Sequence, residues 1–181
     1  MAIYTKKGDK GTTSLYSSQP ATSQRISKDS IRIRTIGSID ELDSFLGLAK
    51  SFCLDLKIQK IISDIQRDLL TIGSCLAGSK LRFSKTKTKK LEKMIDVWEG
   101  NLPRLSHFIL PGGTPLSAQL HVSRSMARRA EREVTALSEV EKVPDSIKIY
   151  MNRLSDFLFM LARLTNSDQK IKEEIWVGKK K

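Results

Sequence analysis

The sequence predicts an all-α protein, a bundle of five helices that follows an irregular N-terminal segment. Two observations lead to this fold class. Apolar residues recur at spacings of three and four in five separate stretches, and the alternating pattern of β-strands is almost absent. A composition of 39% hydrophobic and 29% charged residues is typical of a globular chain rather than a disordered one. We therefore expect a single domain over residues 1–181, with the irregular segment at 1–35, the bundle at roughly 37–167 and a basic tail at 168–181.

The first two helices are predicted at about residues 37–54 and 58–77. In each stretch the apolar residues fall on one helical face, as with Ile39, Leu42, Leu46 and Ala49 in the first. Ser38 is the expected N-cap of the first helix, and Glu41 would complete a capping box with it. Gly78 suits the C-terminal cap of the second helix.

The other three helices are predicted at about residues 88–98, 115–137 and 145–166. Gly100 and Pro103 should end the first of these, because neither residue favours a helix interior. The next helix has Thr114 as its expected N-cap and Pro115 at the first helical position, where proline is favoured.

A short stretch near the N-terminus, T-K-K-G-D-K-G-T-T-S at residues 5–14, concentrates glycine, lysine and hydroxyl side chains. Glycine lets backbone N–H groups converge on a ligand, and lysine adds positive charge. Hydroxyl groups can bond phosphate oxygens or a bound Mg²⁺ ion. The stretch therefore suggests a polyphosphate site, although a polar surface turn would have the same composition.

Three arginines recur every four residues in the predicted fourth helix, at Arg124, Arg128 and Arg132. Like charges at this spacing destabilise an isolated helix by a few tenths of a kcal/mol, roughly, and a polyanion or opposing carboxylates would offset that cost. Glu131 is a single negative charge beside the stripe. The alternative is a basic stripe that faces water.

Polar residues on two other helices are also candidates. Asp40 stands where the first helix is expected to begin, so it either interacts with the helix dipole or forms an ion pair with one of the arginines. Asn152 and Asp156 lie four apart, on the side of the fifth helix away from its apolar residues. That position alone indicates only contact with solvent.

Several classes of protein are disfavoured. The glycine-rich stretch lacks the order of residues in a Walker A loop, and neither His107 nor His121 follows a glutamate at the spacing of di-iron bundles. No apolar run is long enough for a bilayer, and no signal peptide is visible, so we expect a cytoplasmic protein without a membrane partner. The net charge of +12 raises the possibility of nucleic acid, but the lysine clusters lack aromatic neighbours for base stacking.

Taken together, several separated motifs carry a resemblance to a known family. They are I-Y-T-K-K-G-D-K-G-T-T-S-L, G-S-I-D-E-L-D-S-F-L-G, F-I-L-P-G-G, R-S-M-A-R-R-A-E-R and Y-M-N-R-L-S-D-F-L-F-M-L-A-R. In this order and spacing the chain closely resembles the PduO-type ATP:cob(I)alamin adenosyltransferases. The resemblance covers nearly the whole sequence.

This resemblance implies a five-helix bundle that forms a homotrimer and binds ATP with Mg²⁺ between adjacent subunits. It assigns Asp40 and Arg124 to an ion pair across the subunit interface and Arg128 to the reaction centre. The residues implied at the nucleotide are Thr5, Lys6, Lys7, Gly8, Thr13, Ser14, Lys28, Arg128, Glu131, Arg132 and Asn152. Position 7 departs from the family pattern, which commonly has a small or hydroxyl residue there.

The chemistry implied is transfer of the 5′-deoxyadenosyl group of ATP to the cobalt of cob(I)alamin, with release of triphosphate. Phe108 matches the aromatic residue that lies below the corrin in the family. Without the resemblance, the alternative for Phe108 is an ordinary aromatic residue of the hydrophobic core. A cobalamin reductase and an enzyme that receives adenosylcobalamin are the implied partners. Two alternatives are a basic nucleic-acid-binding protein and a helical interaction module with a degenerate ATP site.

Overall fold

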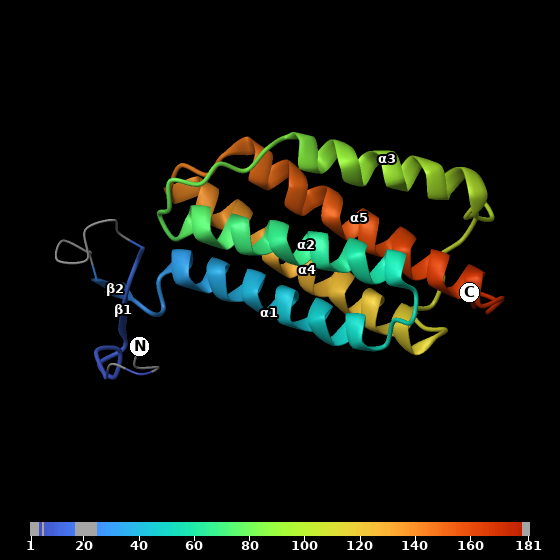
Figure 1. Cartoon of the computed structure of the whole chain (residues 1–181), viewed down its shortest axis with the longest axis horizontal. Coiled ribbons are helices and arrows are strands. Elements are labelled where there is room, and N and C mark those ends of the chain that lie inside the picture. Colours follow the sequence, from blue (N-terminus) through green and yellow to red (C-terminus); the bar gives the residue numbers. More distant parts are fainter. Residues whose placement is uncertain (1–3, 5, 17–24, 179–181) are drawn as a thin grey trace.

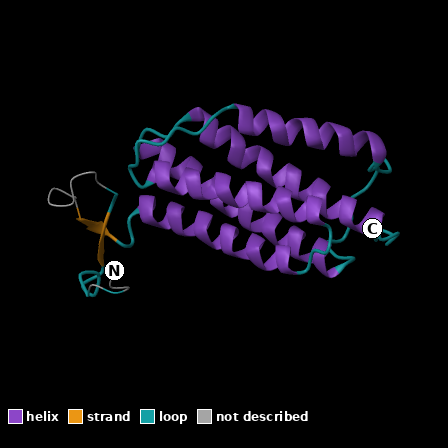
Figure 2. Cartoon of the chain, viewed as in Figure 1, coloured by secondary structure: helices purple, strands orange, loops and turns teal. Residues whose placement is uncertain are grey.

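A computed structural model of the chain describes residues 4, 6–16 and 25–178. In this part of the chain there are five helices. They lie side by side along a common long axis (Figures 1 and 2). They are α1 (Ile31–Ser51), α2 (Leu56–Leu76), α3 (Thr86–Asn101), α4 (Pro115–Val140) and α5 (Asp145–Asp168). The predicted fold class is confirmed. None of these helices is long and apolar enough to cross a membrane.

The core forms where the predicted apolar faces meet. α4 packs against both α1 and α5, while α2 packs against α1 and α3 against α5. Burial of one leucine or isoleucine side chain stabilises the fold by roughly 1.5–3 kcal/mol. Fully buried members of this core are Leu42, Leu46, Ile62, Leu69, Leu120, Leu137, Leu154 and Leu158.

The start of α1 differs from the prediction. The helix begins at Ile31, six residues earlier than expected, and its N-cap is Ser30. Ser38 lies inside the helix and donates to the carbonyl four residues before it, while Glu41 pairs with an arginine of α4. The predicted N-cap and capping box are therefore wrong. The stretch I-R-I-R at 31–34 alternates apolar and charged residues, so it hides the helical period.

Most of the other helix ends follow local sequence signals. The Thr114 hydroxyl accepts a hydrogen bond from the N–H group of the third residue after it, and Pro115 occupies the first turn of α4, as predicted. Gly78 follows α2 with a φ of +97°, the left-handed conformation that glycine favours. Gly100 was expected to end α3, but the helix passes through it and ends two residues before Pro103.

The N-terminal segment contains two short strands, β1 (Thr12–Ser14) and β2 (Arg25–Ser27), where an irregular structure was predicted. They pair antiparallel, with Thr12 opposite Ser27. Strands of three residues are too short for an alternating pattern to be visible in the sequence. The N–H group of Tyr16 donates to the carbonyl of Ala77 at 3.0 Å, which ties the segment to the end of α2. The sheet lies beyond the end of the bundle (Figure 1).

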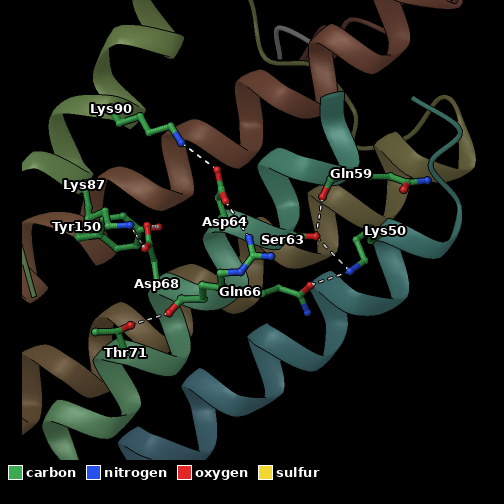
Figure 3. A network of polar contacts seen from close by, with 11 residues as sticks. Lys50, Gln59, Ser63, Asp64, Gln66, Asp68, Thr71, Lys87, Lys90 and Tyr150 are labelled. Carbon is green, nitrogen blue, oxygen red and sulfur yellow. Dashed lines mark hydrogen bonds and ion pairs between the residues drawn. The ribbon is translucent and has the colours of Figure 1, made fainter. Parts of the chain in front are cut away.

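A network of polar contacts holds α1, α3 and α5 against α2 (Figure 3). The buried carboxylate of Asp68 accepts from the Tyr150 hydroxyl at 3.1 Å and from Lys87 at 2.8 Å. Burial, reinforced by this carboxylate, raises the pKa of Tyr150 well above its ordinary value. On the other side of α2, Lys50 of α1 donates to Ser63 at 3.2 Å. These contacts fix the helices that position the candidate site.

Candidate functional site

The predicted site residues are distributed over both ends of the bundle. The Thr35 hydroxyl, near the start of α1, donates to the carbonyl of Glu133, which lies late in α4, at 3.1 Å. The start of α1 therefore lies at the end of the bundle where α4 finishes, and the loop before α4 lies at the opposite end (Figure 1). A helix of 21 residues, such as α1, spans roughly 30 Å. The glycine-rich segment and the loop that carries Phe108 are thus far apart within one chain.

The glycine-rich segment forms a turn around residues 6–10, and Lys28 lies against it. A Cβ atom added to Gly8 would come within 3.2 Å of the Lys28 Nζ atom, so a larger residue at this position would displace the amine. The Lys28 N–H group also donates to the carbonyl of Gly11 at 2.9 Å. Lys28 and the predicted phosphate loop are therefore neighbours. Thr5 lies outside the described residues.

Arg25 also belongs to this region, and sequence reasoning missed it. Its guanidinium donates to the Thr12 carbonyl at 3.0 Å and to the Thr12 hydroxyl at 2.6 Å, and it reaches the carbonyl of Lys7. These bonds fasten the turn to β2. The predicted residues Thr13 and Ser14 form the rest of β1 beside it. Nothing in the sequence signals these contacts, because they depend on how the two strands pair.

The arginine stripe on α4 is present, but its members differ in environment. Arg124 is half-buried, and its buried Nε atom has no hydrogen-bond partner among the described residues. Burial, and secondarily the charge of Arg128, lowers the pKa of Arg124 below its ordinary value. Arg128 and Arg132 are exposed. Arg124 and Arg128 both line a cavity of about 650 Å³.

Glu131 and Asn152 meet across the contact between α4 and α5. The Asn152 amide donates to the Glu131 carboxylate at 2.6 Å. Asp156, one helical turn beyond Asn152, instead accepts from Arg153 at 2.7 Å. Two polar residues that the sequence analysis grouped near the nucleotide are therefore in direct contact.

Asp40 lies on the surface of α1 rather than at its start. Because α1 begins at Ile31, nine residues before Asp40, the predicted interaction of Asp40 with the helix dipole is wrong. Asp40 is exposed and forms no ion pair within the described part of the chain. It borders a groove of about 400 Å³ between α1 and α2, together with Asp43. Burial, opposed by a bond to Gln66 and reinforced by Asp40, raises the pKa of Asp43.

At the opposite end of the bundle, Phe108 borders a cavity of about 790 Å³. Its side chain is 80% exposed, so the alternative of an ordinary core aromatic is wrong. The cavity is also lined by Phe159 and Trp176, by two histidines, His107 and His121, and by Arg124. It is a pocket of aliphatic and aromatic side chains with a few polar groups, which is typical of sites for sizeable organic ligands.

His121 is a further residue of this cavity that the sequence analysis did not assign. It is 3% exposed, and neither ring nitrogen has a hydrogen-bond partner among the described residues. Its ring contacts the ring of Phe159 edge-on, with centroids 5.9 Å apart. Burial, and secondarily the charge of Arg124, lowers its pKa to about 4. Its place three residues before Arg124, on the same helical face, was a signal that could have revealed it.

We expect the protein to lose stability in mild acid because of His121. Its folded pKa of about 4 lies below the unfolded value, so protonation favours the unfolded chain. The stabilisation is complete above pH 6.5 and disappears as the pH falls towards 4. Between pH 7.5 and 5 this residue should account for roughly 2 kcal/mol of lost unfolding free energy.

Urea unfolding at the two pH values measures the effect. The His121→Phe variant should lose less stability than the wild type, whereas a control variant of the exposed histidine, His107→Gln, should behave like the wild type. An equal loss in all three proteins would show that His121 is not responsible.

The sequence model of the cobalamin adenosyltransferase family matches residues 3–165. The chain belongs to this family. It is 39% identical over 178 residues to the corrinoid adenosyltransferase of Bacillus subtilis (strain 168), covering 92% of this chain and 88% of that protein. It is 38% identical to the corrinoid adenosyltransferase of Mycobacterium leprae (strain TN), covering 91% of each chain.

Solved structures agree with this membership of the cobalamin adenosyltransferase family. A phenylalanine-to-alanine variant of the PduO-type ATP:corrinoid adenosyltransferase from Lactobacillus reuteri, complexed with cobalamin and ATP, matches with a TM-score of 0.91 and 33% identity. That match covers 98% of this chain and 100% of the other. An arginine-to-lysine variant of the same type, complexed with ATP, matches with a TM-score of 0.87 and 33% identity, over 97% of this chain and 100% of the other.

These comparisons confirm that this cobalamin adenosyltransferase is a transferase, as the motifs predicted. They favour that function over the alternatives of a nucleic-acid-binding protein and a degenerate module. Within the described residues, no group of three or more histidine, cysteine or acidic side chains could hold a metal ion.

Proposed function

We propose that each active site of this ATP:cob(I)alamin adenosyltransferase is built by two neighbouring subunits of a cytoplasmic homotrimer. The observation that carries the proposal is the separation of the glycine-rich segment from the Phe108 cavity by the length of the bundle. The reacting carbon and cobalt must approach to about 3–3.5 Å, which one chain cannot achieve across that distance. A head-to-tail contact that closes into a ring brings the two ends of different copies together.

Polar groups without partners support this arrangement. Arg124 has a buried Nε atom with no hydrogen-bond partner among the described residues. Asp40 is an exposed carboxylate that also forms no ion pair within that part of the chain. A charge-assisted hydrogen bond between Arg124 and Asp40 of the partner subunit would satisfy both groups. Such a pair would also hold the guanidinium beside the nucleotide.

The nucleotide would lie between the N-terminal segment of one subunit and α4 of the next. Backbone N–H groups of the turn and several cations provide the positive charge that a leaving triphosphate requires. The Glu131–Asn152 pair would hold the nucleoside. We assign to the triphosphate the residues Thr5, Lys6, Lys7, Gly8, Thr13, Ser14, Lys28, Arg128 and Arg132.

This site also suits a Mg²⁺ ion that would bind together with the phosphates of ATP. The hydroxyl oxygens of Thr13 and Ser14 lie on β1 beside the turn, and oxygen ligands of this kind suit the ion. When bound, Mg²⁺ neutralises part of the triphosphate charge.

In the reaction, the cobalt of cob(I)alamin donates an electron pair to C5′ of ATP and forms the Co–C5′ bond. The C5′–O bond breaks at the same time, and triphosphate leaves with the electron pair of that broken bond. The substrate is itself the nucleophile, so the protein needs no serine or cysteine for this role. The task of its side chains is to orient the two substrates and to stabilise the charge that accumulates on the triphosphate.

An anaerobic assay with purified protein, ATP, Mg²⁺ and chemically reduced cobalamin tests the function directly. Adenosylcobalamin and inorganic triphosphate should form in equal amounts. The proposal would be contradicted if the protein did not convert cobalamin and instead bound nucleic acid with an affinity that falls steeply as the salt concentration rises. In the cell, the reaction would require a reductase that supplies cob(I)alamin and an enzyme that accepts adenosylcobalamin.

We assign Phe108 to the lower face of the corrin, where its ring excludes water and the cofactor's own base. Four-coordinate cob(II)alamin, which accepts an electron more readily, is then favoured. Because burial of an aromatic ring contributes roughly 1.5–3 kcal/mol, the Phe108→Ala variant should lose at least about tenfold in the ratio of four- to five-coordinate cobalt.

Visible and EPR spectra of bound cob(II)alamin in the presence of ATP measure this ratio. The Phe52→Ala variant, which removes a half-exposed phenylalanine outside the cavity, serves as the control. A full four-coordinate signal in Phe108→Ala would remove the assigned role.

A further inference from the structure

The loop between α3 and α4 has no helix or strand of its own, yet it carries Phe108. Something outside the loop must therefore hold the ring in place. Two buried polar residues at the end of α5, Arg163 and Asn166, contact the two ends of this loop. Neither residue was assigned a role from the sequence.

Arg163 holds the beginning of the loop and the C-terminal segment together. Its side chain is 4% exposed. Its Nε atom lies 3.0 and 3.1 Å from the two carboxylate oxygens of Glu173, and its Nη2 atom donates to the carbonyl of Pro103 at 2.7 Å. A guanidinium can form these bonds at once because its donors lie in a fixed plane.

The C-terminal segment in turn contacts the loop on both sides of Phe108. The Leu110 N–H group donates to the Glu174 carbonyl at 2.8 Å, and the Trp176 N–H group donates to the Phe108 carbonyl at 2.8 Å. Residues predicted to form a basic tail are therefore paired with the loop as far as Trp176. The ion pair between Arg163 and Glu173 fixes the segment that makes these bonds.

Asn166 holds the other end of the loop. It is 2% exposed, its Oδ1 atom accepts from the Thr114 N–H group at 3.0 Å, and its Nδ2 atom donates to the Gly112 carbonyl at 3.1 Å. Gly113 between them has a φ of +105°, and a Cβ atom there would lie 2.2 Å from Asn166. The second glycine of P-G-G-T thus allows the amide to approach the backbone.

We propose that Arg163, Asn166 and Glu173 are positioning residues that set the ring of Phe108 against the lower face of the corrin. The proposal rests on the function proposed above for Phe108. All the side-chain hydrogen bonds described for these three residues go to one another or to the loop at residues 103–114. Such a pattern orders the loop rather than the helical core.

The Glu173→Gln variant tests the proposal with Glu174→Gln as a matched control. Glu174 is adjacent and exposed, and it contacts the loop through its backbone carbonyl, which the substitution keeps. Arg163→Lys is the second variant, because it retains the positive charge but lacks the planar guanidinium whose separate nitrogens reach Glu173 and Pro103 together. It keeps the test decisive if Glu173→Gln does not fold.

Hydrogen exchange in the ligand-free protein is the first readout. Exchange at the amides of Leu110 and Trp176 should accelerate at least about tenfold in Glu173→Gln, while core amides of α4 stay unchanged. The second readout is the four-coordinate fraction of bound cob(II)alamin, which should fall at least about threefold while the Kd for ATP changes less than about twofold. Glu174→Gln should match the wild type in all of these measurements.

The proposal is overturned if Glu173→Gln and Arg163→Lys match the control at both amides and in the cob(II)alamin spectrum. It is also overturned if the two amides exchange faster while the spectrum stays unchanged, because the loop would then move without moving Phe108. A wild type that forms no adenosylcobalamin would refute the proposed function instead, a result that the turnover assay reports separately.

Discussion

Replacement of Arg128 by alanine is expected to lower kcat/KM for ATP by roughly two to three orders of magnitude, the typical effect of removing one group that stabilises developing charge. Arg128 is exposed on α4 and lines a cavity with Arg124, so its guanidinium is free to contact a ligand. Because negative charge accumulates on the triphosphate as the C5′–O bond breaks, most of the loss should appear in kcat rather than in KM.

Steady-state kinetics of adenosylcobalamin formation under anaerobic conditions measure this loss. The control is Arg129→Ala, which removes an equal charge from the next position, where the side chain pairs with Glu41 on the surface. Arg129→Ala should stay within about threefold of the wild type, as expected for an exposed ion pair. If both variants lose activity equally, the net charge of α4 is important and the position of Arg128 is not.

The helices could be predicted because their signals are local. The apolar stripe of α5 and the cap of α4 at Thr114 depend on residues a few positions apart. The start of α1 could not be predicted, because Ile31 and Ile33 alternate with arginines and Gly37 suggests a helix boundary. Tertiary packing overrides the cost of that glycine, roughly 1 kcal/mol in a helix interior.

The candidate site also divides into residues with a local sequence signal and residues whose contacts depend on the tertiary fold. Arg124, Arg128 and Arg132 were visible as a group because a helix places residues four apart on one face. The contacts of Arg163 and Asn166 were not visible, since their partners Pro103 and Gly112 lie 60 and 54 positions away. The motif P-G-G-T could be read as a break in regular structure, but not as the place where an amide from α5 approaches the backbone.

If the proposed homotrimer forms, two inactive variants should restore activity when they share one trimer, and this is the strongest test of a site between subunits. Lys28→Glu reverses the charge beside Gly8 in the N-terminal segment, and Arg128→Ala alters α4. Each variant alone should retain no more than about a hundredth of wild-type activity. Co-expression with two different affinity tags, followed by two purification steps, yields only mixed trimers.

In a ring where each site joins the N-terminal segment of one subunit to α4 of the next, every mixed trimer contains one site with both halves intact. A working site needs an Arg128→Ala subunit, whose N-terminal segment is intact, followed by a Lys28→Glu subunit, whose α4 is intact. This succession occurs once around the ring, whether the trimer contains two copies of one variant or two of the other. Mixed trimers should therefore show about one third of wild-type activity, with an unchanged KM for ATP at the surviving site. Activity that stays at the level of the separate variants would mean that Lys28 and Arg128 act within one chain, since no chain in the mixture carries both wild-type residues.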